Sequence, residues 1–205
     1  MKPNYKFLSL VYDLLDVVYF NRNDKSPRTA MLNAVPETTV QILDVCAGTC
    51  SNSILIAEKR KNATITALDL SADMLKIAEK KFKQKGLQNI KKVVANASKT
   101  GLPDSSFDII LLSLVLHEIS EDLRVAMLDE AKRLLSQTGQ IIVIEWEQPT
   151  NIIQKILFFP IKQLEPKGFK EFLRRDLSVY FMEKEFNVID VTACDYTRVI
   201  RLAKS

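Results

Sequence analysis

The sequence predicts an α/β fold with a mostly parallel sheet, helices on both faces and a C-terminal antiparallel hairpin. Three observations support this prediction. Apolar runs alternate with amphipathic segments through the middle of the chain, which is the pattern of parallel strands joined by helices. One run, "FDIILLSLVL" at residues 107–116, is apolar at nearly every position, as expected for a strand that is covered on both faces. Two further strand-like runs follow each other directly at the C-terminus.

The individual elements follow from periodicity and capping residues. Runs of apolar and β-branched residues predict strands at residues 38–47, 63–70, 90–97, 107–116 and 140–146. Apolar residues at helical spacing predict the intervening helices at residues 51–60, 71–86 and 121–139. Ser71 is a typical N-cap and Gly86 a typical C-terminal glycine for the second of these helices. Residues 187–205 predict two strands with a turn near residues 195–197, which would give the sheet its antiparallel edge.

Two flanking segments depart from the alternating pattern. Residues 1–36 predict N-terminal helices, one near residues 5–20 and a shorter one near residues 29–35. Residues 150–180 predict a helical cap in pieces, broken at Pro160 and Pro166. The chain has 205 residues, a length that fits one domain, so we expect residues 1–205 to form a single unit.

Composition narrows the class of protein. The formal net charge of +4 is mild, and the only cysteines are Cys46, Cys50 and Cys194. So few cysteines without a framework spacing indicate a reducing compartment. The N-terminal stretch lacks a small-residue cleavage site, and no apolar run reaches the roughly 18 residues that span a bilayer. We therefore expect a cytoplasmic protein. A metal site is not expected, because Cys46 and Cys50 lack a second Cys or His cluster.

Polar groups follow the predicted strands where each one ends. In an open α/β sheet, ligands bind beyond the carboxyl ends of the strands. The candidate site residues at these positions, taken strand by strand, are Asp44, Cys46, Ala47 and Gly48, then Asp69 and Leu70, then Asn96 and Ala97, then His117 and Glu118, and finally Glu145 and Trp146. Their recurrence after five successive apolar runs predicts a binding site at this edge of the sheet.

The stretch "DVCAGTCS" is a nucleotide-binding turn with only one of the usual three glycines. Gly48 keeps the position that permits close approach of a ligand, whereas Cys46 and Cys50 replace the other two. Cysteine is small, so packing can survive, but it would be strained wherever the turn requires a positive φ. Asp69 lies about 20 residues beyond this turn, at the end of the next strand, where a carboxylate can accept hydrogen bonds from ribose hydroxyls.

Together these motifs resemble the class I methyltransferases that use S-adenosylmethionine (SAM), over about residues 40–146. "LDVCAGTCSNS" is similar to the first motif of that Rossmann-like family, "ITALDLSADML" to the second and "EAKRLLSQTGQIIVIEW" to the helix and strand near its end. The start "VYDLLD" and the closing "YTRVIRLAKS" resemble the quinone C-methyltransferases and phospholipid N-methyltransferases. The resemblance implies SAM as cofactor, S-adenosylhomocysteine as product, and a small or lipid-like acceptor methylated at a quinone-type carbon or an amine nitrogen.

The resemblance also implies roles for the strand-end residues. Asp69 would bind the ribose, Met74 would pack near the adenine, and the Asn96 amide oxygen would accept from the adenine amino group. Leu70 and Ala97 would belong to the same cofactor site. Asp44 would orient the turn or meet the amino group of the methionine moiety, next to Cys46, Ala47 and Gly48. His117 and Glu118 are the candidate acids and bases, because a carbon or oxygen acceptor must lose a proton. Glu145, Trp146, Phe158 and Phe159 are the candidate acceptor contacts.

Several alternatives stay open at this point. A protein that binds SAM without turnover would fit the altered glycine turn, and a dinucleotide-dependent oxidoreductase would fit the strand–turn–helix alone. "SLVLHEI" lacks the Asn-Pro-Pro-aromatic box of enzymes that methylate adenine or glutamine amides, so no nucleic-acid substrate is expected. The cap combines "ILFFPI" with basic residues, which predicts either peripheral contact with an anionic membrane or an ordinary helix pair whose charges lie in solvent.

Overall fold

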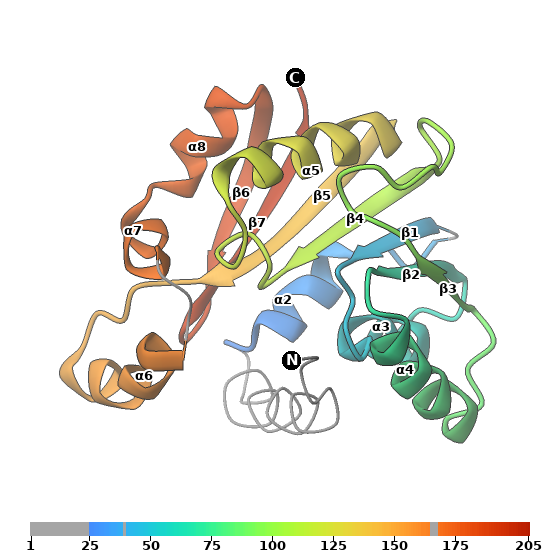
Figure 1. The fold of residues 1–205 in the computed structure, drawn as a ribbon, viewed down its shortest axis with the longest axis horizontal. Coiled ribbons are helices and arrows are strands. Elements are labelled where there is room, and N and C mark those ends of the chain that lie inside the picture. The colour runs from blue at the N-terminus through green and yellow to red at the C-terminus, as the bar shows by residue number, and fades with distance from the viewer. Residues whose placement is uncertain (1–24, 39, 165–167) are drawn as a thin grey trace.

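The computed structural model describes residues 25–38, 40–164 and 168–205. Within them the chain forms a seven-stranded sheet in the order β3-β2-β1-β4-β5-β7-β6 (Figure 1). The first five strands in this order are parallel, and β7 pairs antiparallel with both β5 and β6. The predicted α/β fold with its C-terminal hairpin is therefore confirmed. The strands are β1 (Val40–Val45), β2 (Ala63–Asp69), β3 (Ile90–Val94), β4 (Phe107–Ser113), β5 (Leu135–Trp146), β6 (Phe186–Ala193) and β7 (Thr197–Lys204).

Helices cover both faces of this sheet, and two more lie at one end of it (Figure 1). One face carries α2 (Pro27–Ala34), α3 (Ser51–Lys59) and α4 (Ala72–Gln84), and the other carries α5 (Glu121–Leu134) and α8 (Leu177–Glu183). The helices α6 (Ile152–Leu164) and α7 (Phe169–Arg174) follow the carboxyl end of β5. Alternate residues of each central strand are buried on opposite faces: Ile42 belongs to the core beneath α2 and α3, and Leu43 to the core beneath α5 and α8.

The order of the strands in the sheet determines where a binding site can form. The chain runs outward from β1 to β2 and β3, then returns to add β4 on the other side of β1. The connections after β1 and β4 therefore leave the sheet in opposite directions, which opens a crevice at the carboxyl ends of these strands.

Local signals set most of the boundaries. The Ser71 hydroxyl accepts a hydrogen bond from the Met74 N–H at 3.3 Å, so it caps α4 as predicted. Gly86 follows the helix with a φ of +64°, a conformation that glycine adopts at little cost. The helix buries Met74, Leu75, Ala78 and Phe82, which lie on one face of it.

Two predicted boundaries were wrong, and at the first of them a tertiary contact overrides the local pattern. The helix predicted at residues 121–139 ends at Leu134, and β5 begins at Leu135, which is fully buried and pairs with Phe107. A β-bulge follows, and a Cβ on Gly139 would lie 2.8 Å from the Leu135 side chain. The predicted break at Pro160 is also absent, since α6 continues to Leu164. Proline removes one N–H donor, which this helix tolerates.

Other predictions differ slightly or lie beyond the described residues. The turn between the last two strands comprises residues 194–196, one position earlier than predicted, and the Cys194 N–H donates to the Thr197 carbonyl at 2.8 Å. The predicted break at Pro166 and the predicted helix near residues 5–20 lie outside the described residues.

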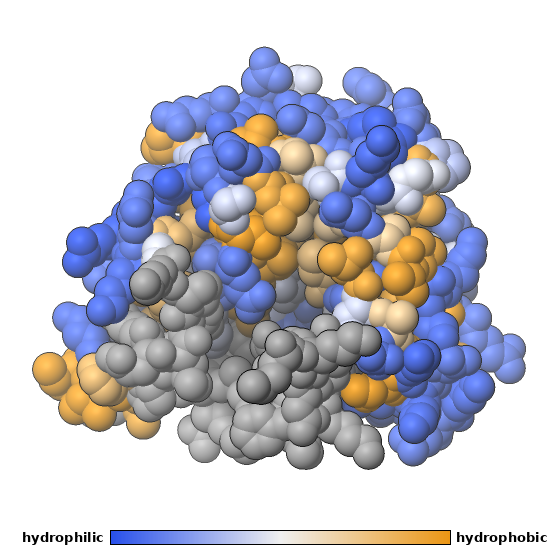
Figure 2. Space-filling model, viewed as in Figure 1, coloured by the Kyte–Doolittle hydropathy of each residue, from blue (hydrophilic) through white to orange (hydrophobic). Residues whose placement is uncertain are grey.

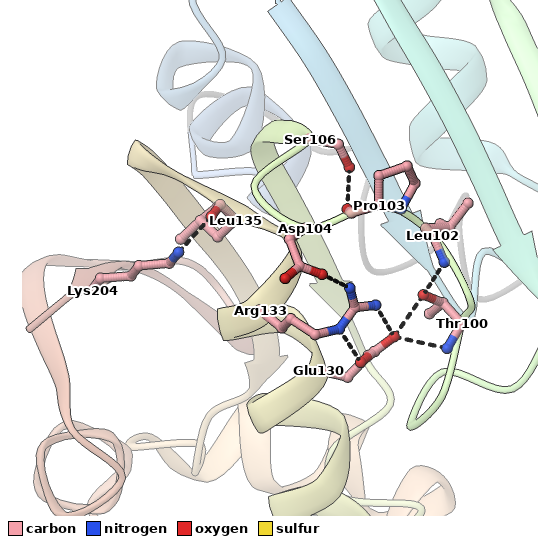
Figure 3. Close-up of polar contacts among 9 residues, drawn as sticks. All are labelled: Thr100, Leu102, Pro103, Asp104, Ser106, Glu130, Arg133, Leu135 and Lys204. Atoms are coloured by element: carbon pink, nitrogen blue, oxygen red, sulfur yellow. Dashed lines mark hydrogen bonds and ion pairs between the residues drawn. The ribbon is translucent and has the colours of Figure 1, made fainter.

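The crossover from β3 to β4 is a loop without a helix, and ion pairs fasten it to α5 (Figure 3). Arg133 pairs with Asp104 in the loop and donates two hydrogen bonds to Glu130, at 2.9 and 2.7 Å. Glu130 in turn accepts from the Thr100 N–H at 2.8 Å and from its hydroxyl at 2.6 Å. The hydrogen bonds from Arg133, followed by those from Thr100, lower the pKa of Glu130 to about 2. This network holds the crossover loop against α5. In a crossover with a helix, packing of that helix on the sheet would hold the connection instead.

Candidate active site

A cavity of about 400 Å³ opens at the carboxyl ends of β1, β2 and β4. That volume lies within the range of small-molecule sites, about 300–1,000 Å³. The predicted cofactor residues that line it are Asp44, Cys46, Ala47, Gly48, Asp69, Leu70 and Met74. Of the predicted catalytic residues, Glu118 lines it as well. The strand ends thus meet around one cavity.

The turn after β1 is built from left-handed residues. Cys46, Gly48 and Cys50 have φ angles of 55°, 54° and 62°, so both cysteines occupy the conformation that strains a side chain. A Cβ added to Gly48 would contact nothing within 4 Å, which leaves the space beside this backbone open to a ligand. The turn therefore keeps the geometry of a glycine-rich turn at the expense of strain at two positions.

The two thiols of this turn stay protonated. Burial, with further contributions from Asp69, Asp44 and Glu118, raises the pKa of Cys46 to about 12. Burial, followed by Asp44 and Asp69, also raises the pKa of Cys50, whose side chain is fully buried among residues of α3, α4 and β2. Since the thiolate is the reactive form, neither group suits redox or nucleophilic chemistry. In the part of the chain that the structure describes, no three His, Cys, Asp or Glu side chains meet in a way that could hold a metal ion.

Asp69 connects the first two motifs. One of its carboxylate oxygens accepts from the Gly48 N–H and the other from the Ser71 N–H, both at 2.8 Å. The carboxylate thereby joins the turn after β1 to the start of α4. It is half-buried and lines the cavity, and each of its oxygens has a further lone pair for a hydroxyl donor.

Asp44 is a buried carboxylate at the end of β1. Its Oδ2 accepts from the Ser53 hydroxyl at 2.5 Å, and burial raises its pKa to about 6 although the bond from Ser53 opposes this shift. The charged residues among the described lining residues are three acids, Asp44, Asp69 and Glu118, and one base, Arg28. The cavity is thus acidic, which fits the sulfonium and ammonium groups of SAM and disfavours the pyrophosphate of a dinucleotide.

The predicted acceptor contact Glu145 is directed toward protein groups. Its side chain is fully buried; one oxygen accepts from the Leu116 N–H at 2.8 Å, and the other lies 2.7 Å from Nδ1 of His117. His117 is also buried and does not line the cavity, although its neighbour Glu118 does. The two predicted catalytic residues therefore differ in position: one faces the cavity and the other lies behind its wall.

The predicted aromatic contacts form a small core beneath the cap. Trp146 meets Phe158 edge to face at 5.3 Å, and Tyr196 stacks on Phe158 at 6.0 Å between ring centroids. Phe169 joins the same cluster. Phe158 is fully buried, Phe159 is 60% exposed, and neither of them lines the cavity as predicted. The ring of Phe158 packs against Trp146 at the end of β5, and Phe159, the next residue on the helix, points outward.

Asn96 and Ala97 do not line the cavity either. The Asn96 side-chain oxygen accepts from the Ser98 N–H at 3.0 Å and from the Ser98 hydroxyl at 2.9 Å, and Ala97 packs against the core beneath α5. The contact of Asn96 with adenine stays a prediction, as do the other assigned roles.

Arg124 supports the site without lining the cavity, and the sequence argument missed it. It is buried in α5, where its Nε donates to the Leu116 carbonyl at 2.9 Å and an Nη donates to the Ile119 carbonyl at 2.9 Å. It thereby fixes the loop that carries Glu118. An arginine in register with the buried Met127, Leu128 and Ala131 is the signal that would have identified it. Leu114, with a φ of 53°, lines the cavity from the same loop and was missed too.

Comparison with protein families gives one match over most of the chain. The profile of the ubiE/COQ5 methyltransferase family matches residues 5–167. Among curated proteins, the demethylmenaquinone methyltransferase of Geobacillus kaustophilus is 28% identical over 211 residues, which cover 93% of this chain and 88% of that protein. The demethylmenaquinone methyltransferase of Geobacillus stearothermophilus is 32% identical over 145 residues, which cover 70% of this chain and 61% of that protein.

Solved structures share the fold. A SAM-dependent methyltransferase from Aquifex aeolicus superposes with a TM-score of 0.75 at 18% identity and covers 98% of both chains. The 1,6-didemethyltoxoflavin-N1-methyltransferase of Burkholderia thailandensis, solved with its substrate and S-adenosylhomocysteine, gives a TM-score of 0.67 at 19% identity over 98% of this chain and 86% of that one. At these identities the likeness shows the fold alone.

The strain at Cys46 predicts an unusual order of stability. Cys46→Gly should be more stable than Cys46→Ala by about 1 kcal/mol, because alanine keeps the strained Cβ and glycine removes it. Urea unfolding of the two variants measures the difference, and both lose the same thiol, so thiol chemistry cancels. An alanine variant as stable as the glycine variant would show that the turn is not strained.

Asp44 predicts a pH dependence of stability. Its pKa rises from 3.8 to about 6 on folding, so its contribution to stability is full below about pH 4 and is lost as the pH rises through 6. Asp44→Asn should therefore stabilise the ligand-free protein near pH 8 by up to about 3 kcal/mol, and the gain should vanish near pH 4. Urea unfolding at several pH values measures this. A gain that does not depend on pH would contradict the assignment.

Proposed function

The chain belongs to the ubiE/COQ5 methyltransferase family, and on that premise we propose that it transfers a methyl group from SAM to a quinone-type, lipid-like acceptor. The resemblance noted in the sequence motifs is thereby confirmed. The acceptor class is supported by the name demethylmenaquinone methyltransferase, which the curated relatives carry. The observation that supports the proposal is the acidic cavity at the ends of β1 and β2, which Asp69 lines and where Asp69 accepts from the Gly48 N–H.

SAM supplies an activated methyl group on a sulfonium, so the protein mainly has to bind, orient and exclude water. Asp69 binds the ribose hydroxyls with its remaining lone pairs, and Gly48 lets the ligand approach the turn closely. Asp44 meets the ammonium group of the methionine moiety. Leu70 and Met74 flank the adenine. The altered glycine turn keeps left-handed geometry at Cys46, Gly48 and Cys50, so it lends no support to binding without turnover.

A carbon acceptor fits the described residues better than an amine. An amine would call for open carboxylate or aromatic groups at the end of β5. There, Glu145 is engaged with His117, Trp146 packs against Phe158, and Glu147 lies 3.4 Å from Arg198. A quinol needs a proton acceptor instead, and Glu118 at the cavity or His117 behind it provides one.

We also propose that α6 rests on an anionic lipid surface. Ile152, Ile156 and Phe159 are spaced by four and three residues on this helix and are 71%, 66% and 60% exposed. Figure 2 shows apolar surface at its lower left, where Figure 1 places α6. Lys155 on α6 and Lys170 on α7 are exposed as well, which suits anionic headgroups. Among the described residues, no helix is long and apolar enough to cross a bilayer.

The SAM site predicts the effect of Asp69→Ala. Loss of the carboxylate should weaken SAM binding by about 1.5–3 kcal/mol, the usual loss for hydrogen bonds to a charged group. Isothermal calorimetry measures this. Asp73→Ala is the matched control, because Asp73 is an exposed acid on α4 that pairs with Lys76 outside the cavity. Equal affinity for both variants would exclude Asp69 from the site.

The acceptor is tested with the same proteins. Wild-type protein, SAM and reduced demethylmenaquinone should give the methylated quinol and S-adenosylhomocysteine, which mass spectrometry detects. Asp69→Ala should lose most of this activity, and Asp73→Ala should retain it. Methylation of a hydrophilic amine in preference to any quinol in a panel would contradict the proposed acceptor class.

The lipid surface predicts the effect of a charge on α6. Ile156→Asp should lower co-sedimentation with vesicles that contain phosphatidylglycerol by at least about tenfold, since an isoleucine side chain gains about 1.5–3 kcal/mol on burial. Met182→Asp is the control, because Met182 is 55% exposed on α8 and lies beside Lys204, at the end of β7 opposite to the turn that Gln154 of α6 contacts. Equal sedimentation of the two variants, or none of the wild type, would leave α6 without a role in membrane contact.

A further inference from the structure

The first turn of α2 supplies the one base among the described residues that line the cavity. Arg28 lines the cavity next to Pro27. The acids that line it are Asp44, Asp69 and Glu118. Three carboxylates and one guanidinium give the cavity an excess of negative charge near neutral pH. A ligand that carries a carboxylate of its own is therefore repelled by most of the charged groups in this wall and attracted by Arg28.

We propose that Arg28 binds the carboxylate of the methionine moiety of SAM and makes the site specific for ligands that retain this group. The inference rests on the SAM site of the proposed function and not on its acceptor. SAM carries two cations, the sulfonium and the ammonium, and one anion, the carboxylate. The acids of the cavity suit the cations, and the base suits the anion. A guanidinium matches the two oxygens of a carboxylate with parallel N–H donors, and its five donors allow it to hold a protein group at the same time.

Local structure holds the backbone of Arg28 at the edge of the cavity. Pro27 is buried at the first position of α2, where its fixed φ suits the start of a helix. The Ser26 hydroxyl accepts from the Arg28 N–H at 3.2 Å, and the Ser26 carbonyl accepts from the Ala30 N–H at 3.1 Å. Met31 is fully buried in the core beneath α2 and α3. The first turn of α2 is thus anchored on both sides of the half-buried Arg28.

The whole of α2 is held in position, and its charge pattern favours an anion near its start. At its far end Arg60 donates to the Val35 carbonyl at 3.1 Å and to the Leu32 carbonyl at 2.8 Å. The dipole of a helix favours acids in the first turn, but α2 has no acid there and has Arg28 instead. The dipole and the guanidinium both attract an anion, so a bound carboxylate relieves the charge that the helix start otherwise disfavours.

Two ligands that differ only in this carboxylate test the proposal: SAM and decarboxylated SAM. Isothermal calorimetry near pH 7.5 should show that the wild-type protein binds SAM at least tenfold more tightly. Arg28→Leu should lower SAM affinity at least tenfold and leave the affinity for decarboxylated SAM unchanged or raised. The preference should therefore vanish or reverse, because the cavity then holds acids alone and decarboxylated SAM has the larger positive charge. Arg28→Lys keeps the charge without the paired donors, so its SAM affinity should lie between the two.

Lys25→Leu is the matched control. Lys25 is an exposed base three residues before Arg28 and does not line the cavity, so this variant loses the same charge and should keep the wild-type preference. The ratio of the two affinities is measured within one variant. Unfolded protein lowers both apparent affinities by the same factor, so Arg28→Leu gives a clear ratio even if part of it is unfolded.

This inference and the proposed function fail in different ways. An Arg28→Leu protein that keeps the wild-type preference, or a wild type that binds both ligands equally, would overturn the role of Arg28 even if quinol methylation is found. A preference retained in Arg28→Leu together with a raised KM for the quinol would assign Arg28 to the acceptor instead. A preference lost in Arg28→Leu alone supports the role even if no quinol is methylated. A wild type that binds neither ligand would overturn the SAM site and this inference together.

Discussion

A carboxylate at the buried end of a strand must find hydrogen-bond donors, and this constraint organises the site. Asp44, Asp69 and Glu145 stand at the carboxyl ends of β1, β2 and β5. Asp44 accepts from the Ser53 hydroxyl, Asp69 from two backbone N–H groups, and Glu145 from the Leu116 N–H, while its other oxygen lies 2.7 Å from Nδ1 of His117. Asp69 and Glu145 each fix a loop that follows another strand, and Asp44 fixes the first turn of α3, so the need of these acids for donors makes the cavity wall rigid.

The same bonds explain how the site tolerates strain. Left-handed conformations at Cys46 and Leu114 each cost about 1–2 kcal/mol, and such a conformation persists only where surrounding structure holds it. The Asp69 carboxylate holds the turn of Cys46 through the Gly48 N–H, and the Leu114 N–H donates to the Ile144 carbonyl at 2.8 Å. Strain and hydrogen bonding therefore occur together at the cavity, where the backbone must leave room for a ligand.

The cofactor half of the molecule could be predicted from the sequence because its signals are local. Strand β2, Asp69 and the Ser71 cap lie within a few residues of one another, and the periodicity of α4 follows directly. The start of β5 could not be predicted, because Leu135 joins the strand by pairing with Phe107, which lies 28 positions earlier in the chain. The partners of Glu145, which was predicted to face the acceptor, could not be foreseen for the same reason. Leu116 and His117 lie far away in the sequence, and no periodic pattern indicates that they meet Glu145.

The region after β5, which comprises α6 and α7, is held together by packing between segments that are distant in the sequence. Trp146 at the end of β5, Phe158 on α6 and Phe169 on α7 form one aromatic cluster, and Phe169 also contacts the ring of His117. Helix α6 is therefore tied to the sheet by Phe158, which is fully buried, while Ile156 and Phe159 on its other side stay exposed. One amphipathic helix thus has two apolar faces with different partners. The buried face connects it through Phe169 to the ring of His117, and the exposed face carries Ile156 and Phe159. A single helix thus joins the aromatic cluster at the end of β5 on one side and carries an exposed apolar face on another.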